Sequence, residues 1–313
     1  MDQDYDIVVA GGGLAGLTTG LTAARLGRKT LVLTGDVIGG QLLSIEKIEG
    51  FPGFPEGVPG YDLAPMTQEE AALAGAEFTA TELKNFTRDG DVWRLTTGEG
   101  DFVTRGLVLA TGAALKELGL PGEARLRGQG VSHCASCDAP LLRGKTAAVI
   151  GGGDSAMQEA LTLSQHVSRV MLLTHGAALT GQMSYRERVT QDPKIEVRTR
   201  TEVEDILGES KVAGLRLREV GGGSSDLNVD AVFVYIGLAP NTGFLGGHLN
   251  LNAGAIPTDA FMRTALSGIC AAGTVRAGSP CRAAGAAGDG ATAAIAIDRY
   301  LTDGVWRDEK TAH

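Results

Sequence analysis

The fold is decided by the stretch Ile7-Val8-Val9-Ala10-Gly11-Gly12-Gly13-Leu14-Ala15-Gly16. Its apolar start predicts a buried strand, and the glycines at positions 11, 13 and 16 have the G-x-G-x-x-G spacing of a dinucleotide-binding turn. Gly11 permits the tight turn, Gly13 lets the backbone approach a pyrophosphate, and Gly16 lets the next helix pack closely on the strand. A helix to Leu26, a stop at Gly27 and a strand over residues 30–33 complete the predicted β-α-β unit. The alternative is a glycine-rich turn that binds nothing, and the flanking strand and helix argue against it.

The same pattern recurs in the middle of the chain. Residues 146–150 predict a strand, and Gly151-Gly152-Gly153-Asp154-Ser155-Ala156 repeats the fingerprint with alanine in place of the third glycine, which the fingerprint tolerates. A helix through Leu163 and a strand over residues 170–173 follow. We therefore predict an α/β protein with two Rossmann-like, three-layer dinucleotide-binding domains, and two such folds indicate two cofactors.

Length and composition limit the classes of function. The chain has 313 residues, more than one average domain, and its 46 glycines show no period, which excludes a collagen-like repeat. With 28 basic and 37 acidic residues the net charge is -9, so neither nucleic acid nor an anionic membrane is expected as a partner. No apolar run approaches the roughly 20 residues that span a bilayer. The acidic residues 1–6 lack the features of a signal peptide, so we expect a cytoplasmic protein.

A pair of cysteines lies just upstream of the second fingerprint, in Cys134-Ala135-Ser136-Cys137-Asp138. Two cysteines at this spacing can close a small disulfide, and in a reducing compartment such a pair is more typical of redox catalysis or metal binding than of a structural framework. No second Cys or His pair is close enough in sequence to complete a zinc site, so we expect no metal and favour redox chemistry. Cys270, in an apolar run, is interpreted as a small buried hydrophobe.

Further short motifs carry a family resemblance by their order and spacing. They are Gly39-Gly40-Gln41-Leu42, Phe51-Pro52-Gly53, Ala110-Thr111-Gly112, Ile236-Gly237, Pro240-Asn241-Thr242 and Ala271-Ala272-Gly273. Together with the fingerprints and the cysteine pair, they make nearly the whole chain resemble the low-molecular-weight thioredoxin reductases, which are FAD flavoproteins. The resemblance implies a discontinuous FAD-binding domain at residues 1–115 and 244–313. It also implies an inserted NAD(P)-binding-like domain at 116–243, which carries the cysteines, and a homodimer.

The resemblance also implies roles for the residues of the redox segment. Cys137 matches the cysteine that exchanges electrons with the flavin, Cys134 the one that attacks the substrate disulfide, and Asp138 the proton donor and acceptor. The alternative for Asp138 is an exposed residue that caps the following turn. His133 either lowers the pKa of Cys134 or shuttles protons near neutral pH, or it is an ordinary surface histidine.

The implied cofactor contacts come from both ends and from the middle of the chain. The FAD contacts are Gly11, Gly13, Leu14, Ala15, Gly16, Thr34, Gly35, Gly39, Gly40, Gln41, Leu42, Thr111, Gly112, Gly273, Thr274, Arg282 and Ala283. The NAD(P) contacts are Gly151, Gly153, Asp154, Ser155 and Ala156.

The chain departs from the family at both cofactors. NADPH-dependent members hold the 2′-phosphate with arginines, and here Thr174-His175-Gly176 and Thr180 stand at those positions. Either NADPH is not preferred, or another loop, including Arg186 or Arg188, supplies the charge. On the FAD side, Thr274 replaces an Asp, and Cys281-Arg282-Ala283 aligns with Arg-Gln-Ala, so FAD binding is expected to be weaker but retained. Cys281 is then either a third redox thiol or a tolerated small side chain.

These patterns leave three hypotheses about function. The first is an FAD-dependent disulfide reductase that passes electrons from NAD(P)H through Cys137 and Cys134 to a thioredoxin-like protein or a small-molecule disulfide. The second is a related flavoenzyme with another route, either a ferredoxin-type donor or a dithiol oxidase that uses oxygen. Asp138 argues against the oxidase, because relatives that work in that direction more often have His there. The third is a flavin redox sensor.

Overall fold

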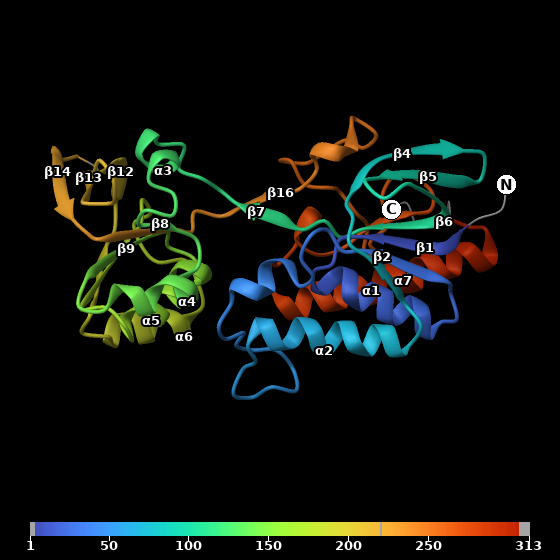
Figure 1. Cartoon of the computed structure of the whole chain (residues 1–313), viewed down its shortest axis with the longest axis horizontal. Helices are drawn as coiled ribbons and strands as arrows, with labels where there is room; N and C mark the ends of the chain where they lie inside the picture. Colours follow the sequence, from blue (N-terminus) through green and yellow to red (C-terminus); the bar gives the residue numbers. More distant parts are fainter. Residues whose placement is uncertain (1–3, 220, 307–313) are drawn as a thin grey trace. The chain divides into compact units, whose positions relative to one another are not determined.

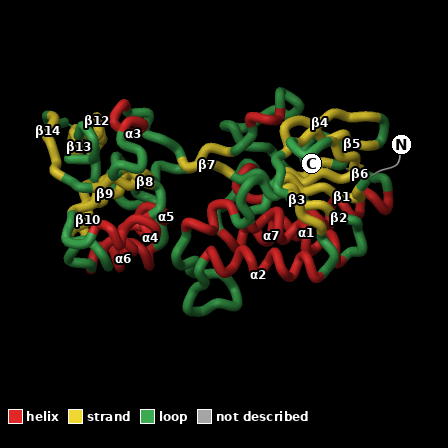
Figure 2. The backbone as a smooth tube through the Cα atoms, viewed as in Figure 1, coloured by secondary structure: helices red, strands yellow, loops and turns green. Residues whose placement is uncertain are grey.

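The computed structural model describes residues 4–219 and 221–306, which form two compact units (Figures 1 and 2). The first unit comprises Met1–Ala114 and Pro240–His313, and the second comprises Leu115–Ala239. The chain passes between them in strands β7 (Ala113–Leu115) and β16 (Leu238–Pro240), which pair with each other. Residues 1–3 of the acidic start lie outside the described residues. Within the described residues, no helix is long and apolar enough to cross a membrane.

The first unit is built on a seven-stranded sheet with the order β3-β2-β1-β6-β5-β4, in which β17 also pairs with β6. Strands β3, β2, β1, β6 and β17 are parallel, whereas β4 and β5 continue from β6 as an antiparallel meander. The strands are β1 (Tyr5–Ala10), β2 (Thr30–Leu33), β3 (Glu77–Thr79), β4 (Leu83–Asp89), β5 (Val92–Thr97), β6 (Asp101–Leu109) and β17 (Ile269–Ala271). The helices are α1 (Leu14–Arg25), α2 (Gly60–Leu73) and α7 (Ala283–Asp303), with short 3-10 turns η1 (Gly40–Ser44), η3 (Gly243–Leu245) and η4 (Gly273–Val275).

The apolar run of strand β1 is continuous because both faces of the strand are buried. Side chains alternate between the two faces of a strand, so Ile7 and Val9 pack with residues of α1 and α7, while Val8 and Ala10 pack against β4 and β5. All of them are buried because helices cover one face of the sheet and the meander covers the other (Figure 1). The result is the predicted three-layer arrangement.

The second unit repeats this architecture around a five-stranded parallel sheet with the order β11-β10-β9-β15-β8. Val149 of β9 packs with α5 and α6, while Ile150 packs against the antiparallel sheet of β12, β13 and β14. The parallel strands are β8 (Val131–Ser132), β9 (Thr146–Ile150), β10 (Arg169–Leu173), β11 (Ile195–Arg198) and β15 (Ala231–Val234). The others are β12 (Thr201–Leu207), β13 (Gly214–Glu219) and β14 (Ser224–Asn228), with helices α3 (Pro121–Arg125), α4 (Ala135–Asp138), α5 (Asp154–Ser164) and α6 (Met183–Gln191) and the 3-10 turn η2 (Ala139–Leu142).

A buried ion pair fixes the start of α7 in the first unit. The guanidinium of Arg276 donates to both carboxylate oxygens of Asp289, at 2.6 and 2.8 Å, and the amide of Gly273 donates to the same carboxylate. The side chains are 14% and 8% exposed, so either charge without its partner would be poorly solvated.

We expect Arg276→Met to lower the free energy of unfolding of the first unit by about 3 kcal/mol, because it leaves a buried carboxylate unpaired. Denaturant unfolding followed by tryptophan fluorescence measures this, since both tryptophans, Trp93 and Trp306, lie in that unit. The matched control is Arg25→Met, which breaks an exposed ion pair with Glu70 and should cost less than about 1 kcal/mol. Equal losses in the two variants would contradict the prediction.

Candidate active site

The first glycine-rich turn combines two crowded glycines with one that faces open space. A β-carbon on Gly16 would lie 1.8 Å from the carbonyl oxygen of Gly11, and one on Gly11, which has φ +121°, would lie 2.2 Å from the carbonyl oxygen of Ala110. A β-carbon on Gly13 would meet nothing within 4 Å. Gly13 is also the N-cap of α1, where no side chain caps the helix and the first turn has no acidic residue. The free amides and the open space suit a pyrophosphate, so this turn fits FAD.

The segment around η1 lies against this turn. The amide of Gly39 donates to the carbonyl of Gly12 at 2.9 Å, and a β-carbon on Gly40 would lie 3.7 Å from the Cα of Gly13. The side-chain amide of Gln41 donates to the carbonyl of Ala113 at 3.2 Å. The structure thus brings Gly39 and Gly40, which are distant in sequence from the fingerprint, into contact with it, and connects Gln41 to the segment after β6.

A second group of predicted FAD residues meets where β6 ends. Gly112 has φ +69°, and a β-carbon there would lie 3.6 Å from Oγ1 of Thr274. Asn241 holds the segment after β6 through two hydrogen bonds to Thr111. Its side-chain amide donates to the main-chain carbonyl of Thr111, and its own main-chain carbonyl accepts from the Thr111 hydroxyl, both at 2.9 Å. The hydroxyl of Thr274 therefore faces the turn at Gly112, and it replaces the family's carboxylate with a neutral hydrogen-bonding group.

Three further predicted FAD residues, Thr34, Arg282 and Ala283, lie just after β2 and at the start of α7. Thr34 follows β2, and its atoms would contact a β-carbon placed on Gly12. Arg282 is the N-cap of α7, and Ala283 is its first residue. Cys281, just before them, is exposed, so the structure leaves both interpretations of this thiol open.

Glu82 is a candidate FAD residue that the sequence analysis missed. The amide of Gly35 donates to the carbonyl of Thr81 at 3.0 Å, and Oε1 of Glu82 lies 3.5 Å from the position of a β-carbon on Gly35. A Rossmann fold commonly holds a ribose with a carboxylate at the end of its second strand. Only the pairing of β2 with β3 brings residue 82 to that place, and no local motif reveals it.

The second glycine-rich turn has the same geometry as the first. A β-carbon on Gly151 would lie 2.2 Å from the carbonyl oxygen of Tyr235, while one on Gly153, the uncapped N-terminus of α5, would meet nothing within 4 Å. Asp154 differs from its counterpart in α1, because its carboxylate accepts the amide of Gln182 at 2.6 Å. This turn therefore fits a second pyrophosphate, with residues 180–182 folded beside it.

The loop after β10 contains no arginine at the positions of the family's 2′-phosphate clamp. Thr174 is buried, and its hydroxyl accepts the amide of Gly176 at 3.3 Å. The alternative cations are on α6, where Arg188 lies over the ring of Tyr185. Arg200 is a further candidate cation, because the structure places its backbone at this loop: its main-chain amide donates to the carbonyl of Gly176 at 2.9 Å. The sequence analysis missed Arg200 because β10 and β11 had to be paired before residue 200 could be placed at this loop.

The two cysteines of the redox segment form a disulfide across the first turn of α4. The sulfur atoms are 2.10 Å apart, and the Cα atoms are 5.4 Å apart. Cys134 is the N-cap of α4 and its sulfur accepts the amide of Cys137 at 3.3 Å. Backbone donors at a helix start stabilise a thiolate, which is the reactive form in disulfide exchange.

Two residues beside the disulfide, Asp138 and His133, have alternative interpretations in the sequence. Asp138 precedes η2, but its side chain makes no capping hydrogen bond to that turn, so the structure does not support the capping interpretation. His133 is half-buried, and its Nδ1 lies 3.2 Å from the carbonyl oxygen of Val234, which leaves its alternatives open. Cys270 is buried, and burial raises the pKa of its thiol, as expected for an unreactive hydrophobe.

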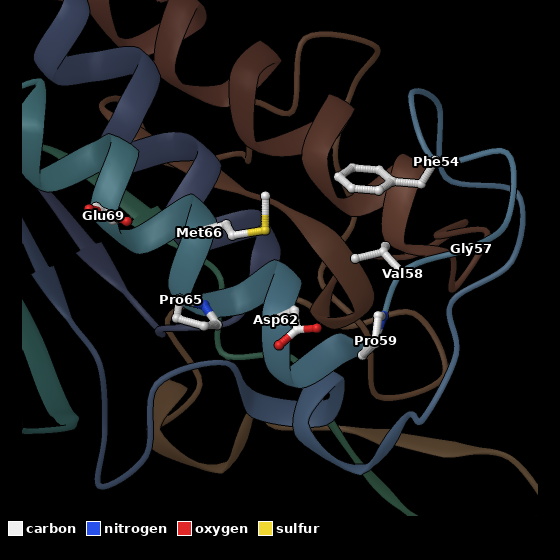
Figure 3. Close-up of a pocket in the computed structure, with 8 residues that line it drawn as sticks. All are labelled: Phe54, Gly57, Val58, Pro59, Asp62, Pro65, Met66 and Glu69. Atoms are coloured by element: carbon white, nitrogen blue, oxygen red, sulfur yellow. The ribbon is translucent and has the colours of Figure 1, made fainter.

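An open hollow on the first unit is not part of this site. It has a volume of about 460 Å³ and lies beside the start of α2 (Figure 3). None of the predicted site residues lines it; its residues are Phe54, Gly57, Val58, Pro59, Asp62, Pro65, Met66 and Glu69.

Comparison with known proteins defines the class. The sequence profile of the pyridine nucleotide-disulphide oxidoreductases matches residues 5–290, and the chain belongs to this family. A thioredoxin reductase of Treponema pallidum is 39% identical over 302 residues, which cover 96% of this chain and 98% of that protein. The crystal structure of Lactococcus lactis thioredoxin reductase matches with a TM-score of 0.93 and 32% identity, over 96% of this chain and 100% of that one.

One further related structure is named for a different electron donor, ferredoxin. The structure of a ferredoxin-flavin thioredoxin reductase from Clostridium acetobutylicum matches with a TM-score of 0.53 and 28% identity, over 96% of this chain and 98% of that one.

Together these findings confirm the resemblance and the α/β fold class with two Rossmann-like domains. The chain is an FAD-dependent pyridine nucleotide-disulfide oxidoreductase.

Proposed function

We propose that this chain is a thioredoxin reductase-type enzyme that passes electrons from NAD(P)H, through FAD and the Cys134–Cys137 disulfide, to the disulfide of a thioredoxin-like protein. The observation that carries this proposal is the disulfide at the start of α4, in a chain that also has two open, uncapped glycine-rich turns. The relatives named thioredoxin reductase support the substrate class.

The proposed division of labour follows the two units. Residues 1–115 and 244–313 would hold FAD, with its pyrophosphate at Gly13 and its ribose beside Glu82, and residues 116–243 would hold the nicotinamide nucleotide at Gly153. FAD, when bound, supplies the two-electron chemistry that links a hydride donor to a disulfide. We also propose a cytoplasmic homodimer, as the resemblance implies.

The chemistry of the thiols follows from their roles. Once the disulfide is reduced, the Cys134 thiolate attacks the substrate disulfide, forms a mixed disulfide and releases one substrate thiol. The Cys137 thiolate then displaces the second substrate thiol and restores the Cys134–Cys137 bond. Asp138 gives or takes the proton at these sulfur atoms, which is consistent with its position at the end of α4.

A second candidate donor, ferredoxin, is favoured by the missing arginines after β10. Anaerobic titration with NADPH and, separately, NADH distinguishes the donors, because reduction bleaches the flavin absorbance. We expect bleaching by NADPH at micromolar concentration if Arg200 replaces the family's clamp, since a guanidinium can pair with the 2′-phosphate. Arg200→Ala should then weaken NADPH binding by about tenfold and leave NADH binding unchanged. The absence of bleaching by either nucleotide would overturn the NAD(P)H proposal and favour ferredoxin.

A further inference from the structure

A buried carboxylate contacts the backbone of the redox segment. Glu159 of α5 is only 7% exposed, and its Oε2 accepts the amide of Ala135 at 3.2 Å. Ala135 directly follows Cys134 and is the first residue of α4, so this amide belongs to the group of donors that would otherwise favour a thiolate. No role in the proposed thiol chemistry uses Glu159.

Tyr235 completes a buried polar cluster with Glu159. Tyr235 follows β15 and is 9% exposed, and both the Glu159 carboxylate and the Ala135 backbone act on the pKa of its hydroxyl. Burial, and then the negative charge of Glu159, hold the pKa of Tyr235 well above its usual range. Its hydroxyl therefore stays protonated at neutral pH, and Glu159, whose carboxylate accepts the Ala135 amide, is the acidic member of the cluster.

We propose that Glu159 is a positioning residue that holds the start of α4 through the Ala135 amide and opposes thiolate formation at the reduced Cys134 and Cys137. This inference rests on the proposed function of the disulfide, whose reactivity it would regulate. A negative charge near a thiol favours the neutral thiol, and it does so most strongly where water is excluded. The enzyme would thereby keep its reduced pair from reacting indiscriminately.

Other charged groups near α5 set the background against which Glu159 acts. Asp138, on α4, has the same sign as Glu159 and contributes to the raised pKa of Tyr235. On β11, Glu196 is paired with Arg169 of β10 and with Arg198, so these charges offset one another. The charged and titratable groups on the elements packed against α5 are Asp138, Arg169, Tyr185, Arg186, Glu187, Arg188, Glu196 and Arg198, and Tyr235 follows β15.

The test replaces Glu159 by glutamine, which removes the charge and keeps an oxygen that accepts the Ala135 amide. The protein is reduced with a dithiol, and the rate of alkylation by iodoacetamide is measured against pH for each cysteine by peptide mass spectrometry. We expect Glu159→Gln to move the inflection of Cys134 or Cys137 to lower pH by about one unit. Cys281, in the first unit, is the internal reference, and Glu202→Gln, at an exposed ion pair, is the matched variant; neither profile should move.

A second variant separates charge from packing. Glu159→Asp keeps the charge with a shorter side chain, so its inflection should stay near that of the parent protein. An unchanged inflection in Glu159→Gln, or an equal shift in both variants, would overturn the inference. The measurement needs neither the physiological electron donor nor a protein substrate, so it can fail while disulfide reductase activity stands, and it can succeed even where the proposed activity is absent.

Discussion

Replacing Cys137 by serine is expected to abolish disulfide reduction, with a loss in rate of about 10⁴-fold, because no second sulfur remains to accept electrons from the flavin or to resolve a mixed disulfide. The measurement is a single turnover, in which anaerobically reduced protein is mixed with an excess of oxidised thioredoxin and the free thioredoxin that carries both thiols is counted. This assay does not depend on the identity of the physiological donor.

The companion variant Cys134→Ser should be equally inactive for a different reason. It retains the cysteine assigned to the flavin side but has lost the one assigned to attack. Both variants should still bind FAD, since neither cysteine belongs to the first unit. Turnover retained by either variant would contradict the assignment, whereas a similar loss in Cys281→Ser would identify Cys281 as a third redox thiol.

Replacing Gly13 by glutamate is expected to remove FAD from the protein, with affinity lowered by at least about 100-fold. The apoprotein should remain folded, because Gly13 has φ -76° and a β-carbon there meets nothing within 4 Å. The added carboxylate would nevertheless lie at the N-terminus of α1, where we place the pyrophosphate, and would repel it. Bound flavin per chain, measured by absorbance after gel filtration, reports the result.

The matched variant is Gly153→Glu in the second unit. Gly153 has φ -91°, and it too is an uncapped N-cap that faces open space. We expect this variant to keep its flavin and to lose binding of the nicotinamide nucleotide, measured by fluorescence titration. If both variants lose flavin, or if Gly13→Glu retains it, the proposed division of cofactors between the two units is wrong.

The fold class followed from the sequence because its signals are local. Strand β2 begins and ends where predicted, as does β9, because each is a short apolar run bounded by turns. Helix α1 ends at Arg25 with Leu26 as its C-cap, one residue before the predicted end, and Gly27 has the left-handed φ of a helix stop. The redox pair was also found locally, and the structure closes it as a disulfide.

The candidate site could be predicted only where its residues belong to a motif. Glu82, Glu159 and Arg200 reach their positions through strand pairing and helix packing between distant segments, and such contacts leave no pattern in the sequence. The same holds for Asn241, which was noted as part of a motif but whose hydrogen bonds to Thr111 are visible only in the structure. The replacement of the family's Asp by Thr274 could be seen in the sequence. Its effect on FAD binding depends on neighbours such as Gly112, which only the structure brings beside it.

The central claim is that the Cys134–Cys137 disulfide exchanges electrons with the flavin, and an anaerobic titration with dithionite tests it most directly. Wild-type protein should take up about two electron pairs per bound flavin before the flavin is fully bleached, one pair for the flavin and one for the disulfide. Cys137→Ser should need about one pair. Complete bleaching of the wild-type flavin by one pair, with the disulfide still oxidised, would contradict the account.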